Sequence, residues 1–397
     1  MPEVVILSAA RTAIGAFQGV FRELPAPKLG AAALAGAIRR AGVLPAAVEQ
    51  VYMGNVLSAG IGQAPARQAA LGAGCPESTG AVTLNKVCGS AMRAVMTAAN
   101  DLRAGDFRLV AAGGMESMSQ APYLAVGVRD GLRLGGGKLV DSMIHDGLWD
   151  PYGDKHMGNC AELCAREYAF SREAQDEFAR ESYARARAAQ ESGAFAAEIV
   201  PVEVPGRKGV TVVDRDEEPY RSDLEKMGGL KPAFDKAGTV TAANASKLND
   251  GAAALVLATA EEAGRLGLRP IARLVAQASF AQQPDWFTTA PVTAVRRALD
   301  RAGLGVDDID LFEINEAFAV VALACRQELG IPAEKLNVRG GAVALGHPIG
   351  SSGARILTTL VHAMKDRNAK RGTAAIRDAA SGDKITPFPM APPKHGA

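Results

Sequence analysis

Cys88 and His347 are the two side chains whose surroundings in the sequence best fit covalent chemistry. Cys88 lies in the run Asn-Lys-Val-Cys-Gly-Ser at 85–90, and apolar residues three or four apart after Gly89 predict a helix that begins there. A helix N-terminus lowers the pKa of a nearby thiol, and the thiolate is the nucleophilic form. A histidine can accept the proton of such a thiol. The pair therefore indicates acyl transfer through a covalent cysteine intermediate.

Glycine-rich sequence surrounds His347, which lies in Gly-Gly-Ala-Val-Ala-Leu-Gly-His-Pro-Ile-Gly-Ser-Ser-Gly at 340–353. Residues with little side-chain bulk allow the imidazole to reach a neighbour and the backbone to approach a substrate. The alternatives are structural: Cys88 could be a buried core cysteine, and His347 a core histidine with its hydrogen bonds satisfied. The small residues around both favour the chemical interpretation.

Asn315 opens the run Asn-Glu-Ala-Phe at 315–318, where a strand is expected to end and a helix to begin. One interpretation is a plain helix N-cap, a position that asparagine favours. The other is functional. Because Asn315 belongs to the same half of the chain as His347, it is a candidate donor to an oxyanion, directly or through water.

The elements that must position these side chains occur twice along the chain. A helix at 34–43 resembles one at 294–304, and a strand follows each, ending near 52–57 and near 311–315. Residues 82–84 and 89–90 align, without a gap, with residues 343–345 and 350–351. This alignment places Cys88 opposite Ile349 and His347 opposite Lys86, and it predicts the same strand, turn and helix around each. The long spacing indicates two related α/β halves whose active-site groups meet at their junction.

Residues 120–248 interrupt this pattern. They contain a glycine-rich turn at 135–137 and a charged helix at about 171–192, for which Ser171 is the expected cap. An insertion of this size beside a catalytic turn is typical of a lid or a substrate-binding subdomain. A dimerisation arm remains an alternative.

Composition agrees with a large enzyme that is free in solution. The 397 residues carry a formal net charge of +1, which gives no general attraction to nucleic acid or to an anionic membrane. Five cysteines in so long a chain do not indicate a disulfide framework, and a reducing compartment is expected. The first apolar strand begins at Val4, which leaves no room for a signal peptide, and no long apolar run predicts a membrane span. A cytoplasmic protein is the expectation.

Four motifs together resemble the thiolase family, most of all its acetoacetyl-CoA-forming branch. They are Asn-x-x-Cys-x-Ser at 85–90, Asn-Ala-Ser-x-x-Asn-Asp-Gly-Ala at 244–252, Asn-Glu-Ala-Phe at 315–318 and Gly-His-Pro-x-Gly at 346–350. The resemblance runs from Val4 to about Ile376. It implies the thiolase fold, in which two duplicated βαβαβαββ-type halves form a five-layered α/β/α/β/α core.

The same resemblance implies a division of the chain. The N-terminal thiolase domain would span 1–268, interrupted by a covering-loop, substrate-binding subdomain at 120–248. The C-terminal domain would span 269–397, with an atypical tail from about 377. The family's dimers and tetramers imply a homo-oligomer, and its chemistry implies a place in lipid metabolism.

The resemblance further implies acetyl-CoA C-acetyltransferase activity, with acetyl-CoA, acetoacetyl-CoA and coenzyme A as the partners. Cys88 would take an acetyl group from one acetyl-CoA while His347 accepts the thiol proton. The enolate of a second acetyl-CoA would then attack the acetyl-enzyme, giving acetoacetyl-CoA, and thiolysis would be the reverse. His347 and a water held by Asn315 would form one oxyanion site, and the backbone N–H of Cys88 would contribute to the other.

Binding residues can be carried over from the family by position. The expected coenzyme A contacts are Leu148, His156, Arg221, Lys226 and Ser246. No cofactor is required, but one branch of the family binds potassium at positions that match Tyr183, Ala242, Ala243, Ala245 and Val343. For Arg221 and Lys226 the alternative is a solvated charged face.

The C-terminus departs from the family. Thiolases end in a strand followed by Cys-x-Gly-Gly-Gly, whose cysteine moves the C2 proton, whereas this chain has Arg-Asp-Ala-Ala-Ser at 377–381 and no cysteine after Cys325. Prolines at 387, 389, 392 and 393 argue against a regular central strand in this tail. We interpret the tail as a frame change or truncation. The alternative function is therefore a catalytically impaired, acyl-CoA-binding thiolase or subunit, and a cysteine amidase is a more distant third.

Overall fold

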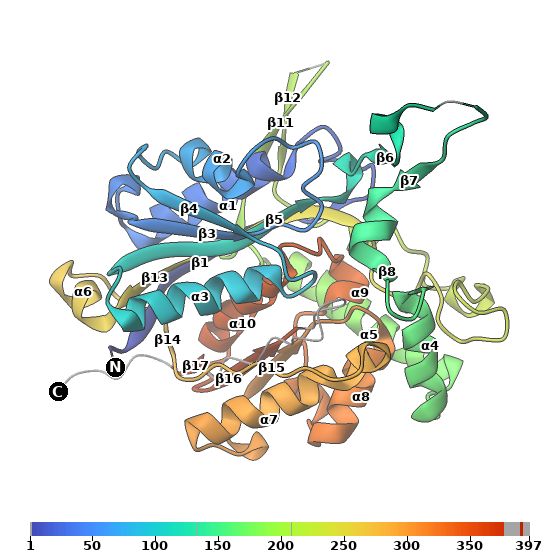
Figure 1. Cartoon of the computed structure of the whole chain (residues 1–397). Helices are drawn as coiled ribbons and strands as arrows, with labels where there is room; N and C mark the ends of the chain where they lie inside the picture. Colours follow the sequence, from blue (N-terminus) through green and yellow to red (C-terminus); the bar gives the residue numbers. More distant parts are fainter. Residues whose placement is uncertain (1, 133, 208, 377–389, 392–397) are drawn as a thin grey trace.

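The computed structural model describes residues 2–132, 134–207, 209–376 and 390–391 (Figure 1). Within them, the main strands join into one mixed sheet with the order β15-β16-β17-β14-β1-β13-β5-β3-β4. The first half contributes β1 (Val4–Thr12), β3 (Gln50–Gly54), β4 (Gly80–Leu84), β5 (Leu109–Ser117) and β13 (Asn249–Thr259). The second half contributes β14 (Ala272–Leu274), β15 (Leu311–Ile314), β16 (Gly372–Ala375) and β17 (Met390–Ala391). Because β14 pairs with both β1 and β17, it joins the two halves.

Figure 1 shows five layers. Helices α1 (Ala26–Ala41) and α2 (Pro65–Gly72) cover the outer face of the first-half strands, and α7 (Ala290–Ala302) and α8 (Ala319–Leu329) cover the outer face of the second-half strands. Between the two sets of strands lie α3 (Ser90–Ala104) and α10 (Ser352–Asp366). Every residue of β1, β5 and β13 is buried, as expected of strands covered on both faces. The predicted five-layered thiolase fold is confirmed.

The two central helices approach each other closely because glycine lies at their contact. A Cβ added to Gly353 of α10 would lie 2.4 Å from the backbone nitrogen of Met92 in α3, which is closer than a side chain tolerates. Both helices begin just after a turn singled out in the sequence. Since the contact is near the start of each helix, it brings these turns together.

The repeat is less complete than its alignment predicted. Residues 82–84 lie in β4, but 343–345 lie in a short helix, α9 (Ala342–Leu345), and not in a strand. The backbone N–H of Val343 donates to the buried carboxylate of Glu316 at 3.1 Å instead of to a neighbouring strand. Gly340 and Gly346 have φ values of 74° and 105°, which turn the chain on both sides of α9. The prediction of a second strand was wrong.

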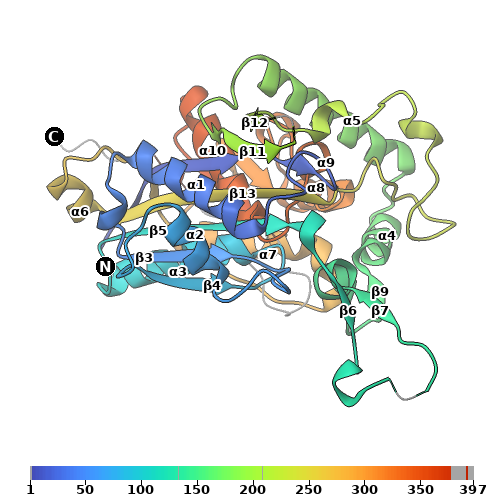
Figure 2. The ribbon, with the colours of Figure 1, turned by 90° about the horizontal axis from the view of Figure 1, so that it is seen from above.

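The insertion at 120–248 lies at one end of the core (Figure 2). Its helices are α4 (Met157–Glu167) and α5 (Arg172–Glu191), and its short strands pair as β6 (Tyr123–Ala125) with β7 (Leu139–Asp141), β8 (Trp149–Asp150) with β9 (Lys155–His156), and β11 (Val202–Gly206) with β12 (Gly209–Val213). The remaining elements are β2 (Gly15–Ala16), β10 (Ile199–Val200) and α6 (Ala260–Arg265). The predicted cap is confirmed, because the Ser171 side chain accepts the N–H of Ala174.

Most of the C-terminal tail, including Arg377 and the Arg-Asp-Ala-Ala-Ser run, lies outside the described residues. Met390–Ala391 is an exception, since this two-residue strand pairs with both β14 and β16. The sequence argued against a regular central strand here, yet a short one lies between β16 and β14 within the second half of the sheet. It is compatible with the prolines because they flank the paired residues and do not occupy them. Over the described part of the chain, no helix has the length and apolar character needed to cross a membrane.

Candidate active site

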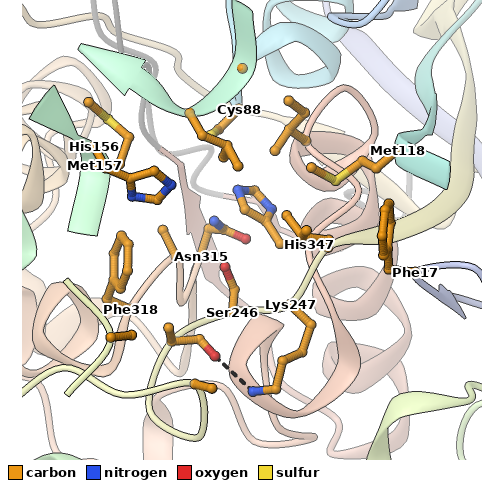
Figure 3. A pocket seen from close by; sticks show the side chains of 18 of the residues that line it. Phe17, Cys88, Met118, His156, Met157, Ser246, Lys247, Asn315, Phe318 and His347 are labelled. Atoms are coloured by element: carbon orange, nitrogen blue, oxygen red, sulfur yellow. Dashed lines mark hydrogen bonds between the residues drawn. The ribbon is translucent and has the colours of Figure 1, made fainter. Parts of the chain in front are cut away.

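A cavity of about 590 Å³ lies where the two halves and the insertion meet. Cys88 from the first half and Asn315 and His347 from the second all line it (Figure 3). Ile144, Leu148 and His156 from the insertion form part of its wall. The structure thus brings together the three residues that the sequence singled out for chemistry.

The Cys88 turn is held by Ser90, the first residue of α3. The Ser90 hydroxyl accepts the N–H of Lys86 at 2.8 Å and donates to the carbonyl of Val87 at 2.6 Å. Val87, next to the thiol, has a φ of 45°, a conformation that a β-branched residue rarely adopts. Such strain costs about 1–3 kcal/mol and persists only where the surrounding contacts impose it. Cys88 is therefore fixed by a closed, strained turn two residues before the helix.

His347 is held by one hydrogen bond to its backbone and one to its ring. Its backbone N–H donates to Asn249 Oδ1 at 2.9 Å, and its Nδ1 lies 2.6 Å from Ser352 Oγ. The single hydroxyl proton of Ser352 is directed to the carbonyl of Pro348 at 2.9 Å. Nδ1 must then be the donor in its contact with Ser352, which leaves the lone pair on Nε2.

The electrostatic surroundings of His347 keep its ring neutral. Burial lowers the pKa of His347 to about 3, and the buried guanidinium of Arg355 lowers it further in the same direction. The Nε2 atom is buried and has no hydrogen-bond partner among the described residues. The neutral ring is the form that can accept a proton, and its acceptor atom lies at the pocket.

Glu116 connects the segment after β3 in the first half with the His347 turn, and the sequence analysis missed it. This buried carboxylate accepts the N–H groups of Val56 and Leu57 from the first half at 3.1 Å, and the N–H of Gly350 from the second half at 2.9 Å. Burial raises its pKa to about 7. The only signal in the sequence was an acidic residue near the end of a buried strand, directly after Gly113-Gly114-Met115. Glu116 positions the His347 turn against the first half.

Asn315 is not the N-cap of α8, since that position belongs to Phe318. Its backbone N–H donates to the carbonyl of Ala375 in β16 at 2.9 Å, which continues the pairing of β15 with β16. Its side-chain Oδ1 is buried with no hydrogen-bond partner in the described parts of the chain. The capping interpretation was wrong. The unpartnered Oδ1 is an acceptor, so it can hold a water that donates in turn to an oxyanion.

Replacing Asn315 by alanine is expected to lower kcat by about 10²-fold, because one oxyanion donor supplies roughly that factor. KM should change little, since the contribution is made in the transition state. Steady-state kinetics of acetoacetyl-CoA thiolysis measures both constants. A variant with unchanged kcat would remove Asn315 from the mechanism.

The expected coenzyme A contacts are only partly brought together. Leu148, His156, Arg221 and Ser246 line the cavity. Lys226 does not: its side chain is 83% exposed and its Nζ pairs with Asp223 Oδ2 at 2.8 Å. The solvated-face alternative therefore fits Lys226 better.

Aromatic side chains that the sequence analysis did not select form one wall of the cavity. Phe234 stacks on the His156 ring with 4.8 Å between centroids and meets the edge of Phe318 at 5.9 Å. Phe318 in turn contacts Phe287. Of these, only Phe318 belongs to a quoted motif, so no local signal identified the others.

The expected potassium site does not fit the residues present. The Lys247 ammonium donates to the backbone carbonyls of Ala245 at 2.9 Å and Val343 at 3.3 Å, two of the predicted ligands. The hydroxyl of Tyr183 lies 2.7 Å from Ser222 Oγ. The Lys247 ammonium thus binds the backbone oxygens of two of the residues at which the family resemblance places potassium.

A cysteine and a neutral histidine that two related halves bring to one buried pocket are typical of a cysteine-nucleophile enzyme. The family model described as the thiolase N-terminal domain matches residues 4–261, and the thiolase C-terminal domain matches residues 268–385, past the point where the motifs ended. The chain belongs to the thiolase family and is an acyltransferase.

Individual relatives are similar over nearly the whole chain. An acetyl-CoA acetyltransferase of Cupriavidus necator is 56% identical over 95% of this chain and 96% of that protein. Acetyl-CoA acetyltransferase 2 of Arabidopsis thaliana is 53% identical over 96% of this chain and 95% of its own. The Acat5 thiolase of Ascaris suum, solved in complex with coenzyme A, has a TM-score of 0.93 at 44% identity and covers 98% of this chain and 100% of its own.

Proposed function

We propose that this protein is an acetyl-CoA C-acetyltransferase that interconverts two acetyl-CoA with acetoacetyl-CoA and coenzyme A through an acetyl-Cys88 intermediate. The observation that carries the proposal is the position of Cys88 and His347 on one pocket, with the buried Nε2 of a neutral ring available as an acceptor. The names of the relatives supply the substrate class. They favour the active enzyme over the catalytically impaired alternative.

In the first half-reaction, Cys88 Sγ attacks the thioester carbon of acetyl-CoA while His347 Nε2 accepts the thiol proton. The tetrahedral intermediate collapses with cleavage of the bond to the coenzyme A sulfur. His347 then returns the proton to the departing thiolate, which leaves as coenzyme A. The position of the Cys88 N–H at the start of α3 suits it to stabilise the intermediate's oxyanion.

In the second half-reaction, a second acetyl-CoA gives a proton from C2 to His347 Nε2, and its enolate carbon attacks the acetyl group on Cys88. A new carbon–carbon bond forms, the bond to sulfur breaks, His347 returns the proton to the Cys88 thiolate, and acetoacetyl-CoA is released. We assign stabilisation of the enolate oxygen to the protonated Nε2–H of His347 and to Asn315 through a water. The buried amide of Asn315 supports this assignment.

The wider setting is also part of the proposal. The relatives support a role in lipid metabolism. None of the five cysteines, all in the described part of the chain, forms a disulfide, which supports a reducing cytoplasm. Large apolar side chains exposed between β6 and β7, among them Val126, Leu134 and Leu139, support a homo-oligomer, with a tetramer as the specific expectation.

Intact mass after incubation with acetyl-CoA, together with thiolysis of acetoacetyl-CoA, tests the function. We expect one acetyl group, mapped by peptide digestion to Cys88, and turnover of acetoacetyl-CoA with coenzyme A. Acetylation without turnover would instead support the impaired alternative. A chain that does neither would overturn the proposed activity and favour a binding or nonfunctional product, and methyl-branched or longer 3-ketoacyl-CoA substrates in the same assay would define the chain length.

A further inference from the structure

Lys247 lies between the proposed substrate contact Ser246 and the segment that holds His347. Its side chain is half-buried at the edge of the cavity, and Figure 3 draws its hydrogen bond. The ammonium donates to the carbonyl of Ala245 on its own segment and to the carbonyl of Val343 in α9. It therefore connects the substrate-binding segment with the helix that leads into His347.

The surroundings of Lys247 are those of a cation site. Its Nζ lies 5.7 Å from the centre of the Tyr183 ring, within the range of a cation–π contact. The carboxylates of Glu218 and Glu316 both favour the charged form of Lys247, although burial lowers its pKa to about 8. At pH 7 the side chain is therefore mainly an ammonium. Two carbonyls, an aromatic face and two nearby carboxylates surround one positive charge.

The two carboxylates are themselves tied to the same segments. Glu218 Oε1 accepts from the Asn249 amide nitrogen at 3.1 Å, and the oxygen of the same amide accepts the N–H of His347. Glu316 accepts from Val343 N and from Ser182 Oγ. Removing the ammonium would take one neighbouring positive charge from both carboxylates and leave Arg221 near Glu218 and Arg355 near Glu316, which is costly for buried carboxylates.

We propose that the Lys247 ammonium is a resident cation that takes the place of a monovalent metal ion and positions Ser246 and His347 relative to each other, so that this enzyme works without potassium. Lys247 is a positioning residue, since its ammonium bonds are to backbone carbonyls. The catalytic part of this inference rests on the proposed thiolysis, whereas cation binding at the site does not.

Two substitutions separate the effect of the Lys247 charge from the effect of its side-chain volume. Lys247→Ala removes the ammonium and leaves the two carbonyls facing an opening that a bare cation could enter. Lys247→Met removes the charge but keeps most of the volume, so it should block that entry. Lys231→Ala is the matched control, because Lys231 is exposed and does not line the cavity.

Kinetics and melting temperature are measured in potassium chloride and in choline chloride at equal ionic strength, since choline is too large for the site. In choline, Lys247→Ala should raise the KM for acetoacetyl-CoA on the order of tenfold or more, with a smaller fall in kcat, because a displaced segment mispositions the substrate. Potassium should reverse most of this loss and raise the variant's melting temperature by about 2 °C or more. The wild type, Lys247→Met and Lys231→Ala should show no such response.

Several outcomes would overturn the proposal. One is a wild type that potassium activates or stabilises as strongly as Lys247→Ala, and another is a Lys247→Ala variant that equals the wild type in choline. A third is a loss of activity in Lys247→Ala that potassium does not reverse.

The cation site can be tested apart from the proposed function. If the wild type lacked thiolysis, the proposed function would fail, but a potassium-dependent melting temperature confined to Lys247→Ala would still support the cation site. If Lys247→Ala did not fold in choline, its folding in potassium alone would also support the site, and failure in both salts would count against it.

Discussion

Replacing Cys88 by alanine is expected to abolish acetyl transfer, with kcat for thiolysis falling on the order of 10⁴-fold or more. A nucleophile that forms a covalent intermediate has no substitute when it is removed, and comparable losses follow removal of other enzymatic nucleophiles. The same variant should show no acetylation in intact mass after incubation with acetyl-CoA. Coenzyme A binding should survive, because alanine removes only the sulfur atom from this position.

The matched control is Cys75→Ala. Cys75 is also a buried, free cysteine, but it follows α2 and does not line the cavity. Its variant should keep wild-type kcat and acetylation at Cys88, even if it loses some stability. Acetylation of the Cys88→Ala chain at another cysteine, with turnover retained, would show that the nucleophile has been misassigned.

Replacing His347 by asparagine is expected to lower kcat on the order of 10³-fold, because general base catalysis contributes roughly 10² to 10⁴. The ring is the proposed proton acceptor for Cys88, and its fixed Nε2 has no replacement among the atoms of asparagine. Acetylation of Cys88 should slow in parallel, which rapid-quench mass spectrometry measures. His145→Asn is the control, since His145 is exposed and does not line the cavity.

The pH dependence follows from the direction of the pKa shift of His347. Its folded pKa is about 3, below the ordinary value of about 6.5, so the ring stays neutral and competent as pH falls from 7 to 5. Over this range kcat/KM should show no acid limb caused by His347. Stability behaves differently, because the unfolded chain takes up a proton below about pH 6.5 while the folded chain does not. The free energy of unfolding should therefore fall on acidification, and less so in His347→Asn. An acid limb of kcat/KM near pH 6.5 that His347→Asn abolishes would contradict the assignment.

Motifs and the internal repeat predicted the fold and the three central residues because both are local in the sequence. Glycines around His347, and a turn followed by a helix at Cys88, can be read without knowing what packs against them. The long spacing of the repeat then predicted that these turns meet. The same alignment failed at α9, where a hydrogen bond to Glu316 decides the backbone conformation.

Residues that act across the two halves could not be identified in this way. Glu116 owes its role to N–H groups from segments on both sides of it in the sequence, and Lys247 to carbonyls on its own segment and in α9. For Lys226 the error is of the opposite kind. Its position matched a coenzyme A contact of the family, but its side chain is exposed to solvent. The charge of a residue and its position in the sequence do not predict which oxygen its side chain will contact in the fold.

The close contact of α3 and α10 has a consequence for synthesis of the chain. Domains fold as units, and the N-terminal one forms first as the chain leaves the ribosome. A nascent first half therefore carries Cys88 without its histidine, because the His347 turn and α10 follow the first half in the chain. The thiol gains its proton acceptor only when α10 packs beside α3, so the reactive pair is assembled only after both halves have been made.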